Sequence, residues 1–333
     1  MVQAPHRGAG IPASVAGQDV PPEPTRARYP ESTGFVERDG VRVFYEVYGS
    51  GKPTILLLPT WSIIHSRFWK MQIPDLARRF RVLTFDPRGN GQSDRPISAN
   101  AYAETEYAAD AVAVMDTTKT ERAVIVSLSM GAQRALVLAS DHQERVSGAV
   151  FIGPALPLAQ TLPGRELARR FTEELDTDEG WARYNSHYWR RDYRAFLEFF
   201  FGECFSEPYS TKPWDDTVAW GLETDPESLI LSQHGPGLRD RDEVIARCSR
   251  VRCPVLVIHG SEDRIRPHAH GLELASATGG TLLTVNGAGH IPNVRDPVRV
   301  NLAIRDFVQS VGTTLGVGTT RPVGTTRPIE GAR

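Results

Sequence analysis

Short runs of apolar residues alternate along the chain with stretches in which apolar side chains recur every three or four positions. The first pattern predicts buried β-strands and the second predicts amphipathic helices. Strands are predicted over Val41–Tyr48, Ile55–Leu58, Arg81–Phe85, Ala123–Val126, Gly148–Ile152, Val255–Ile258 and Leu282–Val285. Helices are predicted over Glu104–Met115, Met130–Ser140 and Pro297–Val311. Because strands that alternate with helices build βαβ units, we expect an α/β fold around a mostly parallel sheet.

The alternation stops between residues 157 and 247, where no strand pattern occurs. This segment contains half of the chain's Phe, Tyr and Trp residues, at helical spacing and separated by charged residues. We interpret residues 157–247 as a helical cap inserted between two strands of the sheet. Its aromatic side chains are expected to form the core of a small helical subdomain or to line a substrate pocket, and both roles can hold together.

The two ends of the chain differ from its middle. Residues 1–32 are rich in proline and poor in large apolar side chains, and residues 313–333 repeat the unit Gly-Thr-Thr-Arg-Pro. Such segments bury too little apolar surface to offset the entropy lost on ordering. We therefore expect a disordered tail over 1–32, a low-complexity tail over 313–333, and a core formed by residues 33–156 and 248–312.

Composition and charge narrow the class of protein. The chain has 333 residues, of which 40% are hydrophobic, with a net charge of −2. This apolar content supports a real core, and the near-zero charge argues against a nucleic-acid partner. No apolar run approaches the ~18 residues of a membrane span, and no signal-peptide pattern occurs, so a cytoplasmic protein is expected.

The three cysteines, Cys204, Cys248 and Cys253, are too few and too irregularly spaced for a disulfide framework or a zinc site. Cys204 lies among aromatic residues and is expected to be buried. Gly89 and Gly91 do not form a dinucleotide fingerprint. Neither a metal nor a cofactor is therefore implied, and the oligomeric state stays open.

The pattern Ser-Leu-Ser-Met-Gly at residues 127–131 lies between a predicted strand and a predicted helix. A nucleophilic serine on such a tight turn needs small residues two positions before and after it, because larger side chains would collide with the strand and helix. Ser129 meets this condition with Ser127 and Gly131, whereas Ser127 as the nucleophile would have the bulky Ile125 in that position. Ser129 is the predicted nucleophile.

A serine hydroxyl needs a base, and in this topology the order along the chain is serine, acid, histidine. Asp263 follows the strand Val255–Ile258, and His290 follows the strand Leu282–Val285. We predict that Asp263 orients the imidazole of His290, which takes the proton of Ser129. The neighbouring Glu262 is expected to point elsewhere.

Four other histidines compete with His290 for a role. His259 at a strand end is expected to pack or to form hydrogen bonds, and His65 follows the strand Ile55–Leu58 and could approach the site. His268 and His270 are expected at the start of a surface helix rather than at a metal. An oxyanion hole would use the backbone N–H of Met130 and one from the loop Pro59–Ser62.

Several segments in this order resemble the α/β-hydrolase superfamily: Ile55–Trp61, Phe85–Asp94, Val124–Ala132, Val257–Asp263 and Gly287–Asn293. The resemblance implies an eight-stranded, mostly parallel sheet with helices on both faces and a helical cap after the sixth strand. It assigns Ser129, Asp263 and His290 to a catalytic triad and makes Trp61 the second oxyanion donor. The chain departs from the family pattern at Pro59-Thr60, where most members have His-Gly, and at Ser127, where most have glycine.

These observations predict a serine hydrolase that cleaves an ester or related acyl bond of a small hydrophobic or aromatic substrate. Two alternatives stay open: hydrolysis of a C–C bond in a diketone by the same triad, and a non-catalytic hydrolase-fold module that binds a ligand or signalling partner.

Overall fold

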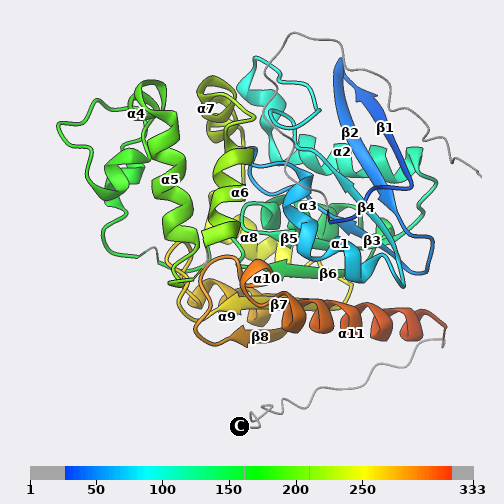
Figure 1. Ribbon diagram of the computed structural model, residues 1–333. Helices are drawn as coiled ribbons and strands as arrows, with labels where there is room; N and C mark the ends of the chain where they lie inside the picture. The colour runs from blue at the N-terminus through cyan, green and yellow to red at the C-terminus, as the bar shows by residue number, and fades with distance from the viewer. Residues whose placement is uncertain (1–26, 161, 210, 317–333) are drawn as a thin grey trace, which may run out of the picture.

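The computed structural model describes residues 27–160, 162–209 and 211–316 (Figure 1). Most of the two predicted tails, residues 1–26 and 317–333, lies outside the described residues. At its C-terminal end the last helix continues to Gly316, so it extends past the predicted end at Val311 and into the segment expected as a tail. The apolar spacing places Val300, Ile304, Phe307, Val308 and Val311 on one face of this helix; all are buried except Phe307, which is partly buried.

The centre of the molecule is an eight-stranded sheet of order β1-β2-β4-β3-β5-β6-β7-β8. The pairs β1–β2 and β2–β4 are antiparallel, and every other pair is parallel. The strands are β1 Ser32–Arg38, β2 Val41–Tyr48, β3 Thr54–Leu57, β4 Arg81–Phe85, β5 Ala123–Leu128, β6 Val146–Ile152, β7 Val255–Gly260 and β8 Thr281–Val285. The predicted mostly parallel α/β fold is confirmed.

All strands named from the sequence are present, with bounds shifted by at most two residues. The central strands β3, β5 and β6 are buried on both faces, which explains their continuous apolar runs. Strand β1 was not identified from the sequence. It is an edge strand, and its alternate residues are exposed.

Helices cover both faces of the sheet (Figure 1). One face packs against α1 (Ile73–Leu76) and α11 (Pro297–Gly316). The other packs against α2 (Glu104–Thr117), α3 (Gly131–Asp141) and α9 (Ala269–Thr278). Alternate residues of one strand enter the two cores: Ile55 and Leu57 face α11, whereas Leu56 faces α2 and α3.

The described residues between β6 and β7 form five α-helices. They are α4 Ser186–Arg191, α5 Tyr193–Cys204, α6 Thr211–Gly221, α7 Pro226–His234 and α8 Arg241–Cys248. Helices α4–α7 stand beside the sheet as a separate group (Figure 1). The buried residues of α8, Val244 and Cys248, instead belong to the core between α3, α9 and the sheet. The predicted insertion 157–247 therefore contains most of one helix that packs with α3 and α9 on the hydrolase core.

The remaining short elements are α10 Pro292–Arg295 and the 3-10 helices Ser66–Met71, Ala99–Tyr102, Gln143–Arg145, Glu166–Arg169 and Gly180–Arg183. No helix within the described ranges is both long and apolar enough to cross a membrane. The three cysteines are free, and Cys204 is buried as predicted.

The order of the strands determines where a site can form. From β3 the chain crosses to β4 on one side, and later to β5 on the other. At such a reversal the loops after adjacent strands diverge and leave a crevice at their carboxyl ends. The loop after β3 carries Trp61, and the turn after β5 carries Ser129.

Candidate active site

Ser129 occupies a strained turn between β5 and α3. Its φ is 52°, in the left-handed region that costs a non-glycine residue about 1 to 3 kcal/mol. Its backbone N–H is held by the carbonyl of Ile152 on β6 at 2.9 Å. This conformation is the one that exposes a nucleophile between a strand and a helix.

The residues two positions either side of Ser129 are small for a steric reason. A Cβ atom at Gly131 would lie 2.8 Å from the carbonyl oxygen of Pro59, so the loop after β3 lies directly against the start of α3. Ser127 is fully buried, and its hydroxyl donates to the carbonyl of Val150 at 3.1 Å. Serine in place of the usual glycine is therefore accommodated without an unpaired polar group.

The structure brings the three predicted residues together. Nε2 of His290 lies 2.8 Å from Oγ of Ser129, and Nδ1 of His290 lies 2.8 Å from Oδ2 of Asp263. His290 is 2% exposed, and its backbone N–H donates to the carbonyl of Cys204 at 3.2 Å. The adjacent Glu262 is exposed, as expected.

Asp263 is held by four hydrogen bonds. Its Oδ1 accepts from the backbone N–H groups of Ile265 and Arg266, both at 2.7 Å. Its Oδ2 accepts from His290 and also from Nε2 of His259 at 3.0 Å. Burial alone would raise the pKa of Asp263, but the attraction of His290 and the histidine hydrogen bonds outweigh it and hold this pKa well below the usual range.

His259, at the end of β7, is a second histidine on the candidate triad acid. Its Nε2 also lies 2.9 Å from the carbonyl oxygen of Arg266. Because a carbonyl only accepts, Nε2 carries the proton and donates to both oxygens. His259 therefore forms hydrogen bonds, which is one of the two roles expected for it from the sequence. The sequence did not reveal its partner, because the loop that folds Asp263 back onto β7 has no sequence signal of its own.

The two predicted oxyanion donors are unengaged. The backbone N–H groups of Met130 and Trp61 donate no hydrogen bond within the described part of the chain. Met130 stands at the N-terminus of α3, where the helix dipole favours negative charge. The indole of Trp61 donates to Oγ of Ser232 at 3.0 Å, which ties the loop after β3 to α7.

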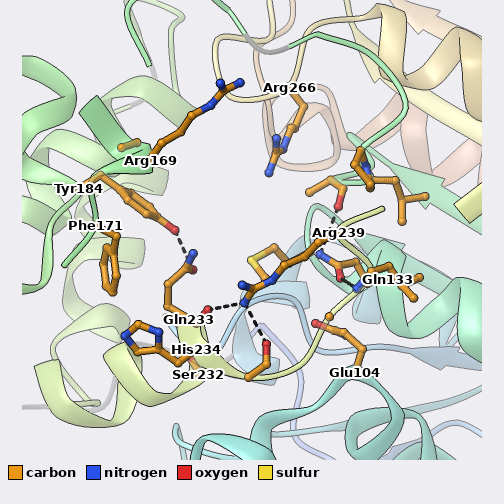
Figure 2. Close-up of a pocket in the computed structure, with 18 of the residues that line it drawn as sticks. Glu104, Gln133, Arg169, Phe171, Tyr184, Ser232, Gln233, His234, Arg239 and Arg266 are labelled. Atoms are coloured by element: carbon orange, nitrogen blue, oxygen red, sulfur yellow. Dashed lines mark hydrogen bonds between the residues drawn. The ribbon is translucent and has the colours of Figure 1, made fainter. Parts of the chain in front are cut away.

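A cavity of about 570 Å³ opens beside this site (Figure 2). Met130 forms part of its wall, although Ser129 and His290 themselves do not. Two aromatic residues of the insertion, Phe171 and Tyr184, also line it. Most other aromatic residues of the insertion are buried against each other, for example Trp189 on Phe196 with ring centroids 4.4 Å apart. The aromatic segment thus supplies both a core and part of a pocket wall.

The other three histidines weighed from the sequence, His65, His268 and His270, make no hydrogen bond or ion pair with the candidate triad. Nε2 of His65 is 3.3 Å from a carboxylate oxygen of Glu223, and His268 pairs with Oγ1 of Thr284 at 2.9 Å. His270 is 1% exposed and bonds the carbonyl of Leu156, so the expected surface position is wrong for this residue. His270 faces inward because it lies on the same side of α9 as Leu274, which is buried in the core against the sheet. Within residues 27–316 as described, no group of three or more His, Cys, Asp and Glu side chains could hold a metal ion.

A family model described as the alpha/beta hydrolase fold matches residues 53–297, and the chain belongs to this family. It is 28% identical over 274 residues to the AB hydrolase superfamily protein YisY of Bacillus subtilis (strain 168), covering 81% of this chain and 96% of that protein. It is 28% identical over 281 residues to the 2-hydroxymuconate semialdehyde hydrolase of Pseudomonas sp. (strain CF600), covering 81% and 91%.

Solved structures agree with this assignment. Est816, described as an N-acyl homoserine lactone degrading enzyme, superposes with a TM-score of 0.66 at 26% identity, covering 82% of this chain and 100% of that chain. The resemblance stated from the sequence motifs is confirmed at the level of family and fold.

Proposed function

We propose that this protein is a serine hydrolase that cleaves an ester or related acyl bond of a small molecule through Ser129, His290 and Asp263. The observation that carries this proposal is the continuous chain of two 2.8 Å contacts from Oγ of Ser129 through His290 to Asp263. A positive φ at the serine and two unengaged N–H groups beside it support the same chemistry.

In the first half of the reaction, Oγ of Ser129 attacks the substrate carbonyl carbon, and Nε2 of His290 takes the hydroxyl proton. Asp263 stabilises the imidazolium and keeps Nδ1 protonated. The N–H groups of Met130 and Trp61 hold the negative oxygen of the tetrahedral intermediate. The C–O bond then breaks, and His290 gives its proton to the departing alcohol.

In the second half, water attacks the acyl-enzyme and His290 takes a proton from it. The bond between Oγ and the acyl carbon breaks, and the proton returns to Ser129. The products are a carboxylic acid and free enzyme.

Hydrolysis of a C–C bond is the second candidate. It is favoured by the similarity to a protein named 2-hydroxymuconate semialdehyde hydrolase, which covers most of both chains. The triad would be the same, so the substrate and not the nucleophile separates the two reactions.

The first experiment is labelling with a fluorophosphonate probe, which reacts with an activated serine. We expect the native protein to be labelled and Ser129→Ala to be inert. Ser127→Ala is the matched control, because Ser127 is two residues away and its hydroxyl is turned to Val150. An unlabelled native protein contradicts the proposal and favours a non-catalytic ligand-binding module. Labelling that survives Ser129→Ala also contradicts it, because another residue would then be the reactive nucleophile.

The second experiment compares turnover of phenyl acetate with turnover of a vinylogous diketone. Faster hydrolysis of phenyl acetate supports the ester reaction. Faster cleavage of the diketone, abolished by Ser129→Ala, would move the assignment to C–C bond hydrolysis.

A further inference from the structure

The cavity beside Ser129 carries an excess of positive charge. Arg169, Arg239 and Arg266 line it, and among its described lining residues Glu104 is the one acidic side chain. Both carboxylate oxygens of Glu104 are engaged by Arg134, at 3.0 and 3.1 Å. The negative charge on the wall is thus already neutralised by a residue outside the lining.

Arg266 joins the cavity to the candidate triad. Its backbone N–H donates to Oδ1 of Asp263, and its carbonyl accepts from His259. Its side chain turns the other way, toward the open centre of the cavity (Figure 2). Tight anchoring of the backbone therefore sets where the guanidinium stands relative to the site.

The Arg266 guanidinium meets no acceptor among the described residues. It makes no hydrogen bond or ion pair with any residue that the structure describes, and its Nε is buried without an acceptor. Burial lowers the pKa of Arg266, yet an arginine stays protonated at neutral pH. Arg266 is half-buried at the cavity wall with only its Nε fully enclosed, so an anion that enters the cavity can pair with the guanidinium at a site already partly shielded from water.

Arg239, on the cavity wall, and Arg165, outside the lining, are two further positive charges in this region. Nη2 of Arg239 donates to the carbonyls of Gln233 and Gly235, at 3.0 and 3.1 Å, and meets no carboxylate within the described ranges. The guanidinium of Arg165 lies 3.9 Å from the ring centre of Trp181. Burial and the nearby Arg266 lower the pKa of Arg165 to about 10, which leaves it charged at pH 7.

We propose that the cavity binds a carboxylate of the substrate through Arg266 and Arg239, so that the natural substrates are small esters or lactones that also carry a free acid group. The planar fork of a guanidinium matches the two oxygens of a carboxylate. This inference rests on the proposed hydrolase function. It adds a free acid group to the small hydrophobic or aromatic substrate expected from the sequence. Phe171 and Tyr184 also line the cavity and offer an apolar surface for its carbon skeleton.

The kinetic test uses esters matched in shape and different in charge. One pair is 4-acetoxybenzoate and 4-acetoxybenzamide, and the other is the monophenyl ester of glutaric acid and its primary amide. A charge-assisted hydrogen bond predicts about a 10- to 100-fold higher kcat/KM for the acid in at least one pair. In Arg266→Met this preference is expected to fall to about one, because that variant keeps the length of the side chain and removes its charge.

Arg264→Met is the matched control. Arg264 is exposed on the same loop and does not line the cavity, so the variant loses the same net charge elsewhere. It should retain the full preference for the acid. Two results would overturn the carboxylate site and leave the hydrolase assignment intact. In the first, the native enzyme cleaves the ester bond of the neutral, amide-bearing compounds as fast as that of the acidic ones. In the second, the preference for the acidic esters survives Arg266→Met.

A binding measurement separates the two proposals completely. Calorimetry with Ser129→Ala protein, which needs no turnover, should show benzoate binding at least about tenfold more tightly than benzamide. Combining Ser129→Ala with Arg266→Met should remove that difference, and combining it with Arg264→Met should not. Equal binding of benzoate and benzamide contradicts the carboxylate site, whereas absent labelling by fluorophosphonate contradicts the hydrolase function alone.

Discussion

The candidate triad and the neighbouring cavity differ in how their charged groups are paired. Both carboxylate oxygens of Asp263 and both ring nitrogens of His290 have partners at 2.7 to 3.0 Å. In the cavity, Arg266 has no acceptor among the described residues. A satisfied network keeps its geometry without a ligand, whereas a half-buried guanidinium that lacks an acceptor gains one when an anion binds. The contrast separates a region suited to chemistry from a region suited to recognition.

Asp263→Asn tests the triad side and is expected to have the largest effect. The amide cannot keep the His290 tautomer that accepts the serine proton, so kcat/KM should fall about 10⁴-fold, for acidic and neutral esters alike. Glu262→Gln, an exposed change on the same loop, is the control and should stay near the native rate. A loss smaller than about tenfold would mean that another acid orients His290.

The same variant has a stability readout. The pKa of Asp263 is lower in the folded protein than its unfolded value near 4. Its carboxylate therefore stabilises the fold above that value, and this contribution is lost as the pH falls toward the folded-state pKa. Denaturant titrations at pH 6 and pH 3 should show a larger drop in the free energy of unfolding for the native protein than for Asp263→Asn. Equal drops would contradict the ionised, hydrogen-bonded carboxylate.

Phe196→Ala tests the aromatic packing that supports the cavity wall. Phe196 is fully buried on α5 and stacks on Trp189. Its truncation should lower the free energy of unfolding by about 3 to 5 kcal/mol. Tyr209→Ala, at a residue that is 85% exposed, should cost less than about 0.5 kcal/mol. Similar losses for both variants would show that the α4–α7 group is not held by this core.

His259→Phe is expected to have the smallest effect on the triad side. It removes one donor from the Asp263 carboxylate and leaves the other three, so kcat should fall about tenfold with KM nearly unchanged. Because His259 acts through Asp263, the pH profile of kcat should shift as well. His259→Gln, which retains a donor, should recover part of the rate. A change in KM alone would assign His259 to substrate binding instead.

The strands and the three candidate triad residues could be found from the sequence because each has a local signal. A buried parallel strand needs a continuous apolar run, and a serine on a strained turn needs small neighbours such as Gly131. Strand β1 lacks such a signal, because an exposed edge strand is only half apolar. The continuation of α11 beyond Val311 was missed because threonine and glycine predict the end of a helix.

The arginines of the cavity had no such signal. Arg239 and Arg266 are 27 positions apart, on segments that precede and follow β7, and neither belongs to a motif. An arginine in a sequence is normally a solvated surface residue, as Arg264 is here. Arg264 faces solvent and Arg266, two residues later, faces the cavity. Only the backbone conformation of the loop after Asp263 decides this difference.

The sequence by itself determined the α/β fold class, the order of the strands along the chain and the candidate triad of Ser129, Asp263 and His290. These follow from periodicity and from steric demands that act over a few residues. The tertiary structure alone decided that His259 shares Asp263 with His290 and that Arg266, without an acceptor among the described residues, lines the same cavity as Met130. Both depend on distances between segments remote in the chain, and those distances are set by the packing of the whole sheet and its inserted helices.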